Sequence, residues 1–139
     1  MKINFKENLE KIGLDAENAI VIGSGILSAL GLRESQDIDV VVDEVAYERL
    51  SVDAQFKKAD NHGHEVLVGS LFEIGKSWFV LGKEWTFDDF LNHSVVIEGV
   101  RYATIQFILD VKKSWALEPD ARQKDKDDIK LIEEYLKKN

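Results

Sequence analysis

The sequence predicts a single α/β domain of mixed helices and strands, the α+β class, over residues 1–139. Apolar runs with strand-like alternation are separated by glycines from stretches of helical periodicity. The chain has 139 residues, enough to bury one core without disulfide bonds or a structural metal. It contains no repeat and no proline-rich linker. We therefore expect a core over about residues 15–103, followed by C-terminal helices over about 104–138.

Five short elements are expected in the first part of the chain. Apolar residues at helical spacing end at Gly13 and again at Gly31. Apolar runs that are too short for a helix predict strands. The expected elements are a helix over residues 5–12, a strand over 19–22, a helix over 26–30, a strand over 37–42 and a helix over 45–50.

The middle of the chain predicts short strands, one helix start and a hairpin. Thr86 is followed three residues later by Asp89, a pairing typical of a helix N-cap. Residues 95–102 predict a hairpin that turns at Glu98 and Gly99. The strand-like segments before them lie near residues 66–68, 71–75 and 78–81.

Two helices are expected after the core, with Pro119 between them. Thr104 predicts the N-cap of the first helix, and the apolar spacing that follows places Lys112 near its core-facing side. A lysine in that position requires an anionic partner. The last helix is expected to pack on the preceding one through an apolar stripe formed by Ile129, Ile132 and Leu136.

Asp37 and Asp39 form an acid-x-acid pair in the predicted strand over 37–42. On a β-strand, residues i and i+2 lie on one face about 6.6–6.8 Å apart. Two carboxylates held in this way suit one Mg²⁺ ion, or two ions beside a triphosphate. The alternative is an ordinary strand with a solvated acidic face.

The segment Gly23-Ser24-Gly25 connects a predicted strand to a predicted helix. Its backbone N–H groups and the positive end of the helix would favour an anionic phosphate. For either glycine alone, a tight turn is the alternative.

Two parts of the chain resemble a known family. Ile22-Gly23-Ser24-Gly25 followed by Asp37-Ile38-Asp39 resembles the signature of the nucleotidyltransferase superfamily with the DNA polymerase β fold, in its small single-domain bacterial branch. Lys112 and the segment from Arg122 to Ile129 resemble the lysine helix and the R-x-K-D-x-x-D-hydrophobic helix of members related to abortive-infection and toxin–antitoxin nucleotidyltransferases.

This resemblance implies a nucleotidyltransferase fold, in which a mixed β-sheet is flanked by helices. It also implies that Gly23 and Ser24 bind the phosphates of an NTP, and that Asp37 and Asp39 ligate two Mg²⁺ ions. Active members carry a third carboxylate on a later strand, for which Glu73 is the candidate. A solvated strand glutamate is the alternative for Glu73.

The charge distribution points to further phosphate-binding candidates. Residues 1–111 have a net charge of −9, whereas residues 112–139 have a net charge of +1. Cations that face phosphate are therefore expected in the C-terminal helices, although a solvated helix with ion pairs along it is the alternative. The candidates are Lys112, Arg122 and Lys124.

Arg33 lies in the loop just before the predicted acidic strand. An arginine in this loop could bind the γ-phosphate of an NTP through two hydrogen bonds. Pairing with Glu34 or Asp37 is the simpler alternative.

The overall composition excludes several classes of protein. A formal net charge of −8 argues against general DNA or RNA binding. The absence of cysteine excludes disulfide bonds and thiolate chemistry, and it is compatible with a reducing cytoplasm. No apolar run approaches the roughly 18 residues of a membrane span. We therefore expect a cytoplasmic protein without a membrane partner.

The expected function is Mg²⁺-dependent transfer of a nucleoside monophosphate from an NTP to an acceptor hydroxyl on a protein, an RNA or a small molecule. Asp37, Asp39 and Glu73 would be the catalytic residues. The alternative is a catalytically silent nucleotidyltransferase-like domain that binds a partner protein, as an antitoxin or a scaffold. A functional third carboxylate distinguishes the active enzyme from the silent domain, because a domain without this carboxylate could still bind nucleotide.

Overall fold

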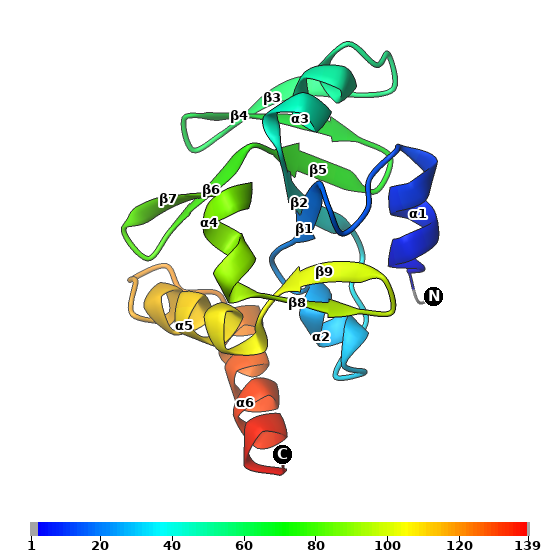
Figure 1. Ribbon diagram of the computed structural model, residues 1–139. Helices are drawn as coiled ribbons and strands as arrows, with labels where there is room; N and C mark the ends of the chain where they lie inside the picture. The colour runs from blue at the N-terminus through cyan, green and yellow to red at the C-terminus, as the bar shows by residue number, and fades with distance from the viewer. Residues whose placement is uncertain (1–2, 139) are drawn as a thin grey trace.

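The computed structural model describes residues 3–138 and has an α+β architecture, a mixed β-sheet flanked by helices (Figure 1). The helices are α1 (Phe5–Lys11), α2 (Gly25–Ala29), α3 (Glu44–Ser51), α4 (Phe87–Phe90), the 3₁₀ helix η1 (Leu91–His93), α5 (Ile105–Ala116) and α6 (Gln123–Lys138). The strands are β1 (Ala19–Val21), β2 (Ile38–Val42), β3 (Lys57–Asn61), β4 (His64–Gly69), β5 (Phe72–Gly75), β6 (Ser77–Val80), β7 (Lys83–Thr86), β8 (Ser94–Ile97) and β9 (Val100–Ala103).

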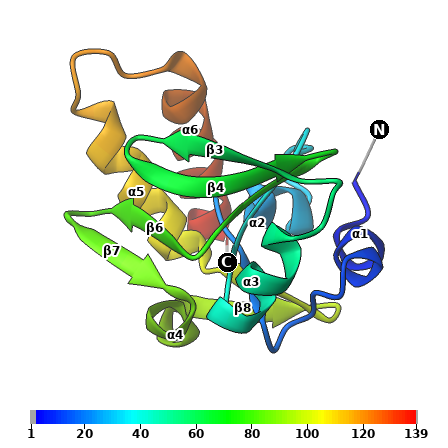
Figure 2. The same ribbon diagram turned by 90° about the horizontal axis from the view of Figure 1, so that it is seen from above.

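The main sheet has seven strands in the order β3-β4-β5-β2-β1-β9-β8. β2 is parallel to β5 and antiparallel to β1, and β1 is parallel to β9. β6 and β7 form a separate two-stranded hairpin, which can be followed beside the main sheet in Figure 2. Strands β5, β2 and β1 therefore form the middle of a mixed sheet.

The central strands are built from apolar residues. Every residue of β1 is buried, and so is every residue of β2 except Asp39. Strands that are covered on both faces typically have such continuous apolar sequences. Asp39 is only partly buried, and it is the single polar residue of β2. A carboxylate in a central strand of this kind requires a physical explanation.

The predicted helix caps and the predicted late hairpin are confirmed. Thr86 and Asp89 form a reciprocal capping box at the start of α4, and the Thr104 side chain accepts a hydrogen bond from the backbone of α5. β8 and β9 form the expected hairpin around Glu98 and Gly99. Both turn residues have positive φ angles, 48° and 82°, as a tight two-residue hairpin turn requires.

Two strands, β3 and β7, are missing from the sequence prediction. All residues of β3 are exposed except partly buried Asn61, and β7 has only Trp85 partly buried. Such segments lack the alternation of apolar and polar residues on which a strand prediction depends. β3 is an edge strand, and its charged side chains are typical of a protected sheet edge.

α5 and α6 form the predicted C-terminal helical pair and lie side by side in Figure 1. Pro119 lies in the connection between them. Of the predicted apolar stripe, Ile132 is fully buried, Ile129 is partly buried and Leu136 is 36% exposed. Within residues 3–138, none of the helices combines the length and the apolar character that crossing a membrane requires.

The substitution Ile132→Ala should lower the free energy of unfolding by about 2–5 kcal/mol, because it leaves a cavity where α6 meets the core. The matched control is Leu136→Ala, one turn later on the same helix, where 36% of the residue is already exposed. Urea denaturation should show a clearly smaller loss for the control. Equal losses for both variants would contradict the burial of Ile132 between α6 and the core.

Candidate functional site

Two carboxylates lie next to each other on the central strands β2 and β5. These strands are parallel, and Asp39 pairs in register with Glu73. Adjacent strands are about 4.8 Å apart, and residues in register share a face of the sheet. Asp37 directly precedes β2, two residues before Asp39, and its charge acts on Asp39. The structure therefore places Asp37 and Glu73 within electrostatic range of Asp39.

The predicted phosphate loop lies beside the same carboxylate. A Cβ atom added at Gly23 would lie 3.1 Å from Oδ2 of Asp39, and Gly23 has a φ of +67°. Both facts favour glycine, because a side chain would be strained there and would crowd the carboxylate. The backbone N–H of Ile22 donates to the backbone C=O of Asp39 at 2.8 Å. Ser24 is the N-cap residue of α2, but its hydroxyl makes no capping hydrogen bond.

The electrostatic environment disfavours a charge on Asp39. Burial is the largest cause, and the neighbouring charges of Asp37 and Glu73 add to it, so that together they raise the pKa of Asp39 to about 7. Lys124, an exposed residue in the first turn of α6, acts in the opposite direction. Lys124 is thus one predicted phosphate-binding residue that acts electrostatically on the acidic site.

The other predicted cations contact two buried aspartates near the start of α6. Arg33 donates to both carboxylate oxygens of Asp128, at 2.6 and 2.8 Å. Lys112 Nζ lies 3.0 Å from Asp125 Oδ1 and 3.0 Å from Asp128 Oδ2. Arg122 donates to the two oxygens of Asp125 at 3.1 and 3.2 Å. We call these five residues the α6 ion-pair network.

In this network, the favourable interactions of the cations with Asp125 and Asp128 exceed the unfavourable effect of burial on the ionised carboxylates. Burial opposes the charge on Asp125 and Asp128, but hydrogen bonds from their cationic partners keep the pKa of each carboxyl below its ordinary value. Lys112 is only 4% exposed, so its expected core-facing position and anionic partners are confirmed. Phosphate binding by Arg33, Lys112 and Arg122 stays a prediction, and a phosphate would have to share or replace these ion pairs.

Three residues of this region were not among the candidates from the sequence. Asp125 and Asp128 are three positions apart on α6, so they lie on one helix face. The available signal for them was the core-facing Lys112, which needs an anionic partner. Asn61, whose Nδ2 donates to Oε2 of Glu73 at 3.1 Å, had no such signal. It lies on β3, a strand that was itself not predicted.

The three acids suit a hard divalent cation in their chemistry. Carboxylate oxygens are the ligands that Mg²⁺ prefers, and no side chain at Gly23 crowds Oδ2 of Asp39. Over residues 3–138, however, no three acidic, histidine or cysteine side chains are arranged as a metal-binding group. Metal binding by Asp37, Asp39 and Glu73 therefore stays a prediction. To bind one ion together, the three side chains would have to rotate, although the backbone already places Asp39 and Glu73 in register.

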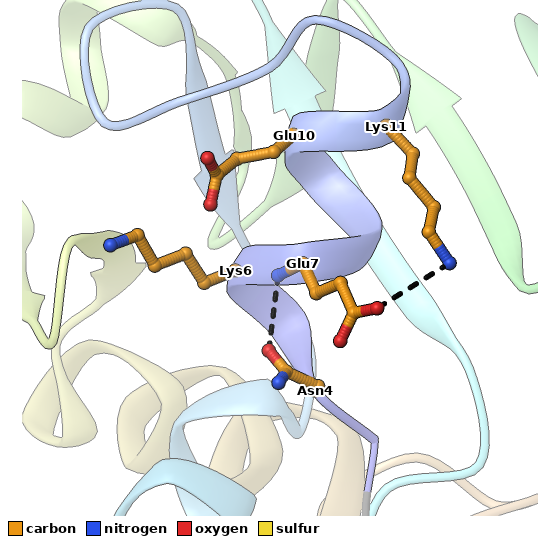
Figure 3. Close-up of a pocket in the computed structure, with 5 residues that line it drawn as sticks. All are labelled: Asn4, Lys6, Glu7, Glu10 and Lys11. Atoms are coloured by element: carbon orange, nitrogen blue, oxygen red, sulfur yellow. Dashed lines mark hydrogen bonds and ion pairs between the residues drawn. The ribbon is translucent and has the colours of Figure 1, made fainter.

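A separate hollow lies beside α1 and is shown in Figure 3. Lys6 and Lys11 extend to opposite sides of the helix in that view. Glu7 lies 3.7 Å from Lys11, and the side chain of Asn4 caps the backbone of Glu7 at 3.0 Å. These contacts stabilise α1 itself, and we assign no ligand to this hollow.

Comparison with known proteins adds no assignment for this site. Neither protein-family models nor curated proteins nor solved structures gave a significant match to the chain.

The substitution Lys112→Met should lower the free energy of unfolding by about 3–5 kcal/mol, because it leaves two buried aspartates with too little compensating charge. The neighbouring exposed Lys113, 3.3 Å from Glu133, offers the matched control. Lys113→Met should cost less than about 1 kcal/mol, as expected for a surface ion pair. Denaturant unfolding of both variants measures the difference, and similar small losses would argue against a buried network.

The raised pKa of Asp39 predicts that stability changes with pH. The folded-state pKa is about 7, above the value of about 3.9 for an unfolded aspartate, so the folded state binds the proton more tightly. The contribution of Asp39 to stability should therefore be lost as the pH rises from about 4 to 7. Without divalent ions, Asp39→Asn should melt at a higher temperature than the wild type at pH 8, and at nearly the same temperature at pH 4. Glu48→Gln, at an exposed position on α3, is the control and should show no such pH-dependent gain.

Proposed function

We propose that this chain is a Mg²⁺-dependent nucleotidyltransferase, which transfers a nucleoside monophosphate from an NTP to an acceptor hydroxyl. The acceptor would be a protein, an RNA or a small molecule. The observation that carries the proposal is the in-register pair of Asp39 and Glu73 on adjacent parallel strands, with Asp37 and the Gly23 loop beside it. The likeness of the glycine-serine loop and the acid-x-acid strand to the nucleotidyltransferase signature supports the same proposal.

Each residue of the site has a role in this proposal. Gly23 and Ser24 would bind phosphate oxygens through the backbone, because no side chain at Gly23 obstructs their approach. Asp37, Asp39 and Glu73 would hold Mg²⁺, which would supply charge stabilisation for the transferred phosphoryl group. Lys124 would add positive charge near the leaving pyrophosphate. Glu73 would also be placed to accept the proton of the acceptor hydroxyl.

This chemistry requires no covalent intermediate on the protein. Phosphoryl and nucleotidyl transfer depend mainly on positioning and on electrostatic stabilisation. A rigid arrangement of carboxylates is therefore more useful than a nucleophilic side chain. Central strands supply that rigidity, since Ile38 and Val40, the neighbours of Asp39 in β2, are 0% and 1% exposed.

A second candidate is the catalytically silent nucleotidyltransferase-like module, which would bind a partner protein as an antitoxin or a scaffold. The α6 ion-pair network favours it, because Arg33, Lys112 and Arg122 are occupied by carboxylates. A domain of this kind would bind NTP weakly and would not transfer it. The association with toxin–antitoxin systems rests only on this second proposal and on the family resemblance.

The proposal is tested by incubating the protein with each α-³²P-labelled NTP, Mg²⁺ and a cell lysate. We expect label on a macromolecule or metabolite with the wild type, and none with Asp39→Asn or with EDTA, because the metal ligands are then incomplete. Glu73→Gln should lower kcat by at least about 100-fold while changing NTP affinity little, since a proton acceptor acts in the transition state. Asp110→Asn, at an exposed position on α5, is the control.

Metal-dependent NTP binding without any transfer, in every lysate tried, would favour the silent module. Equal NTP affinity in Mg²⁺ and in EDTA, measured by calorimetry, would overturn the metal-dependent mechanism.

A further inference from the structure

We infer that Asn61 is a positioning residue for the third carboxylate, Glu73, an inference that rests on the proposed function. Asn61 is the last residue of β3, and its amide Nδ2 donates to Oε2 of Glu73 at 3.1 Å. In the sheet, β4 separates β3 from β5. A side-chain hydrogen bond across that intervening strand requires the tip of the β3–β4 hairpin to curl toward the face that carries the acids.

The tip of this hairpin is braced by the other hairpin, β6–β7. Asn61 pairs in register with His64, the first residue of β4. Nδ1 of His64 lies 2.8 Å from Oε1 of Glu84 on β7. The His64 ring also stacks on Phe79 of β6, with centroids 6.2 Å apart and planes 16° from parallel. Asn61 is therefore presented to Glu73 from a supported position.

The chemistry of an amide donor fits this role. A glutamate has more freely rotating bonds than an aspartate, and fixing its side chain costs conformational entropy. The hydrogen bond from Asn61 engages Oε2, so in this proposal Oε1 is the oxygen that would ligate the metal. A neutral amide does this without adding charge to a face that already holds three carboxylates. Partners of this kind, behind a metal ligand, typically change metal affinity or activity by 10–100-fold when they are removed.

The test compares Asn61→Leu, Glu73→Gln and the double variant with the wild type. Leucine keeps the branched arrangement of heavy atoms of asparagine and removes its hydrogen-bonding groups. The readouts are the Mn²⁺ dissociation constant from EPR without nucleotide, kcat and KM for NTP, and the melting temperature. Lys58→Gln, at an exposed position on β3 whose side chain makes a surface ion pair with Glu65, is the control and should equal the wild type in all four.

We expect Asn61→Leu to weaken Mn²⁺ binding and to lower kcat, each by about tenfold. KM and the melting temperature should change little. The double variant should be no worse than Glu73→Gln alone, because Asn61 acts through Glu73 and the two effects are then not additive.

Three results would overturn the inference. If Asn61→Leu retains wild-type Mn²⁺ affinity and kcat while Glu73→Gln loses both, Asn61 has no positioning role, although the proposed function stands. If the losses in the double variant add, Asn61 acts by another route. If the wild type itself neither binds Mn²⁺ nor transfers nucleotide, the proposed function fails and the inference fails with it.

Discussion

The main physical constraint on this fold is that carboxylates of like charge, Asp39 and Glu73, are held next to each other on the central strands β2 and β5. Asp39 lies in a strand whose other residues are all buried and apolar, and it pairs with a second carboxylate on the next strand. Hydrophobic packing fixes the backbone of β2, so the strand cannot turn its acids away to solvent without exposing Ile38 and Val40. The fold therefore keeps Asp39 partly buried beside two other carboxylates, and burial first, then these neighbouring charges, raises its pKa.

The second constraint is the α6 ion-pair network, which connects three distant parts of the chain. Arg33 belongs to the loop that leads into Asp37, Lys112 belongs to α5, and the two aspartates belong to α6. Ser35 in the same loop donates to the backbone C=O of Ser24 at 3.2 Å. The loop is thus attached to α6 on one side and to the glycine-serine loop on the other. This arrangement keeps the start of α6, and with it Lys124, close to the acidic face.

The sequence predicts the central elements well because their signals are local. A short apolar run, an acid-x-acid alternation, a threonine N-cap and a Glu-Gly turn each depend on a few neighbouring residues, and the structure has the corresponding elements. β3 was not predicted, because an edge strand of charged residues is stabilised by its partner strand and not by its own pattern.

Long-range partners are harder to infer than local elements. The bidentate partner of Arg33 is 95 residues away, and nothing in the flanking sequence identifies it. The sequence predicts that Lys112 needs an anionic partner, but it does not identify Asp125 and Asp128 as that partner. The same limit applies to Asn61, whose contact with Glu73 depends on how a hairpin curls.

The assignment of cations to the network changes the charge balance of the acidic face. Arg33, Lys112 and Arg122 are paired with only two carboxylates, Asp125 and Asp128, so the network keeps one surplus positive charge, and Arg33 interacts electrostatically with Asp37. Lys124 is the cation that acts on Asp39, so its single charge and the surplus charge of the network face three carboxylates, one of which, Asp39, has a pKa raised to about 7. A surface that merely displayed solvated acids would not need to hold them on buried central strands. A divalent cation beside these hard oxygen ligands would stabilise the ionised form of Asp39, which burial and the neighbouring acids disfavour, and this is the physical reason for proposing a metal-dependent role over a solvated strand face.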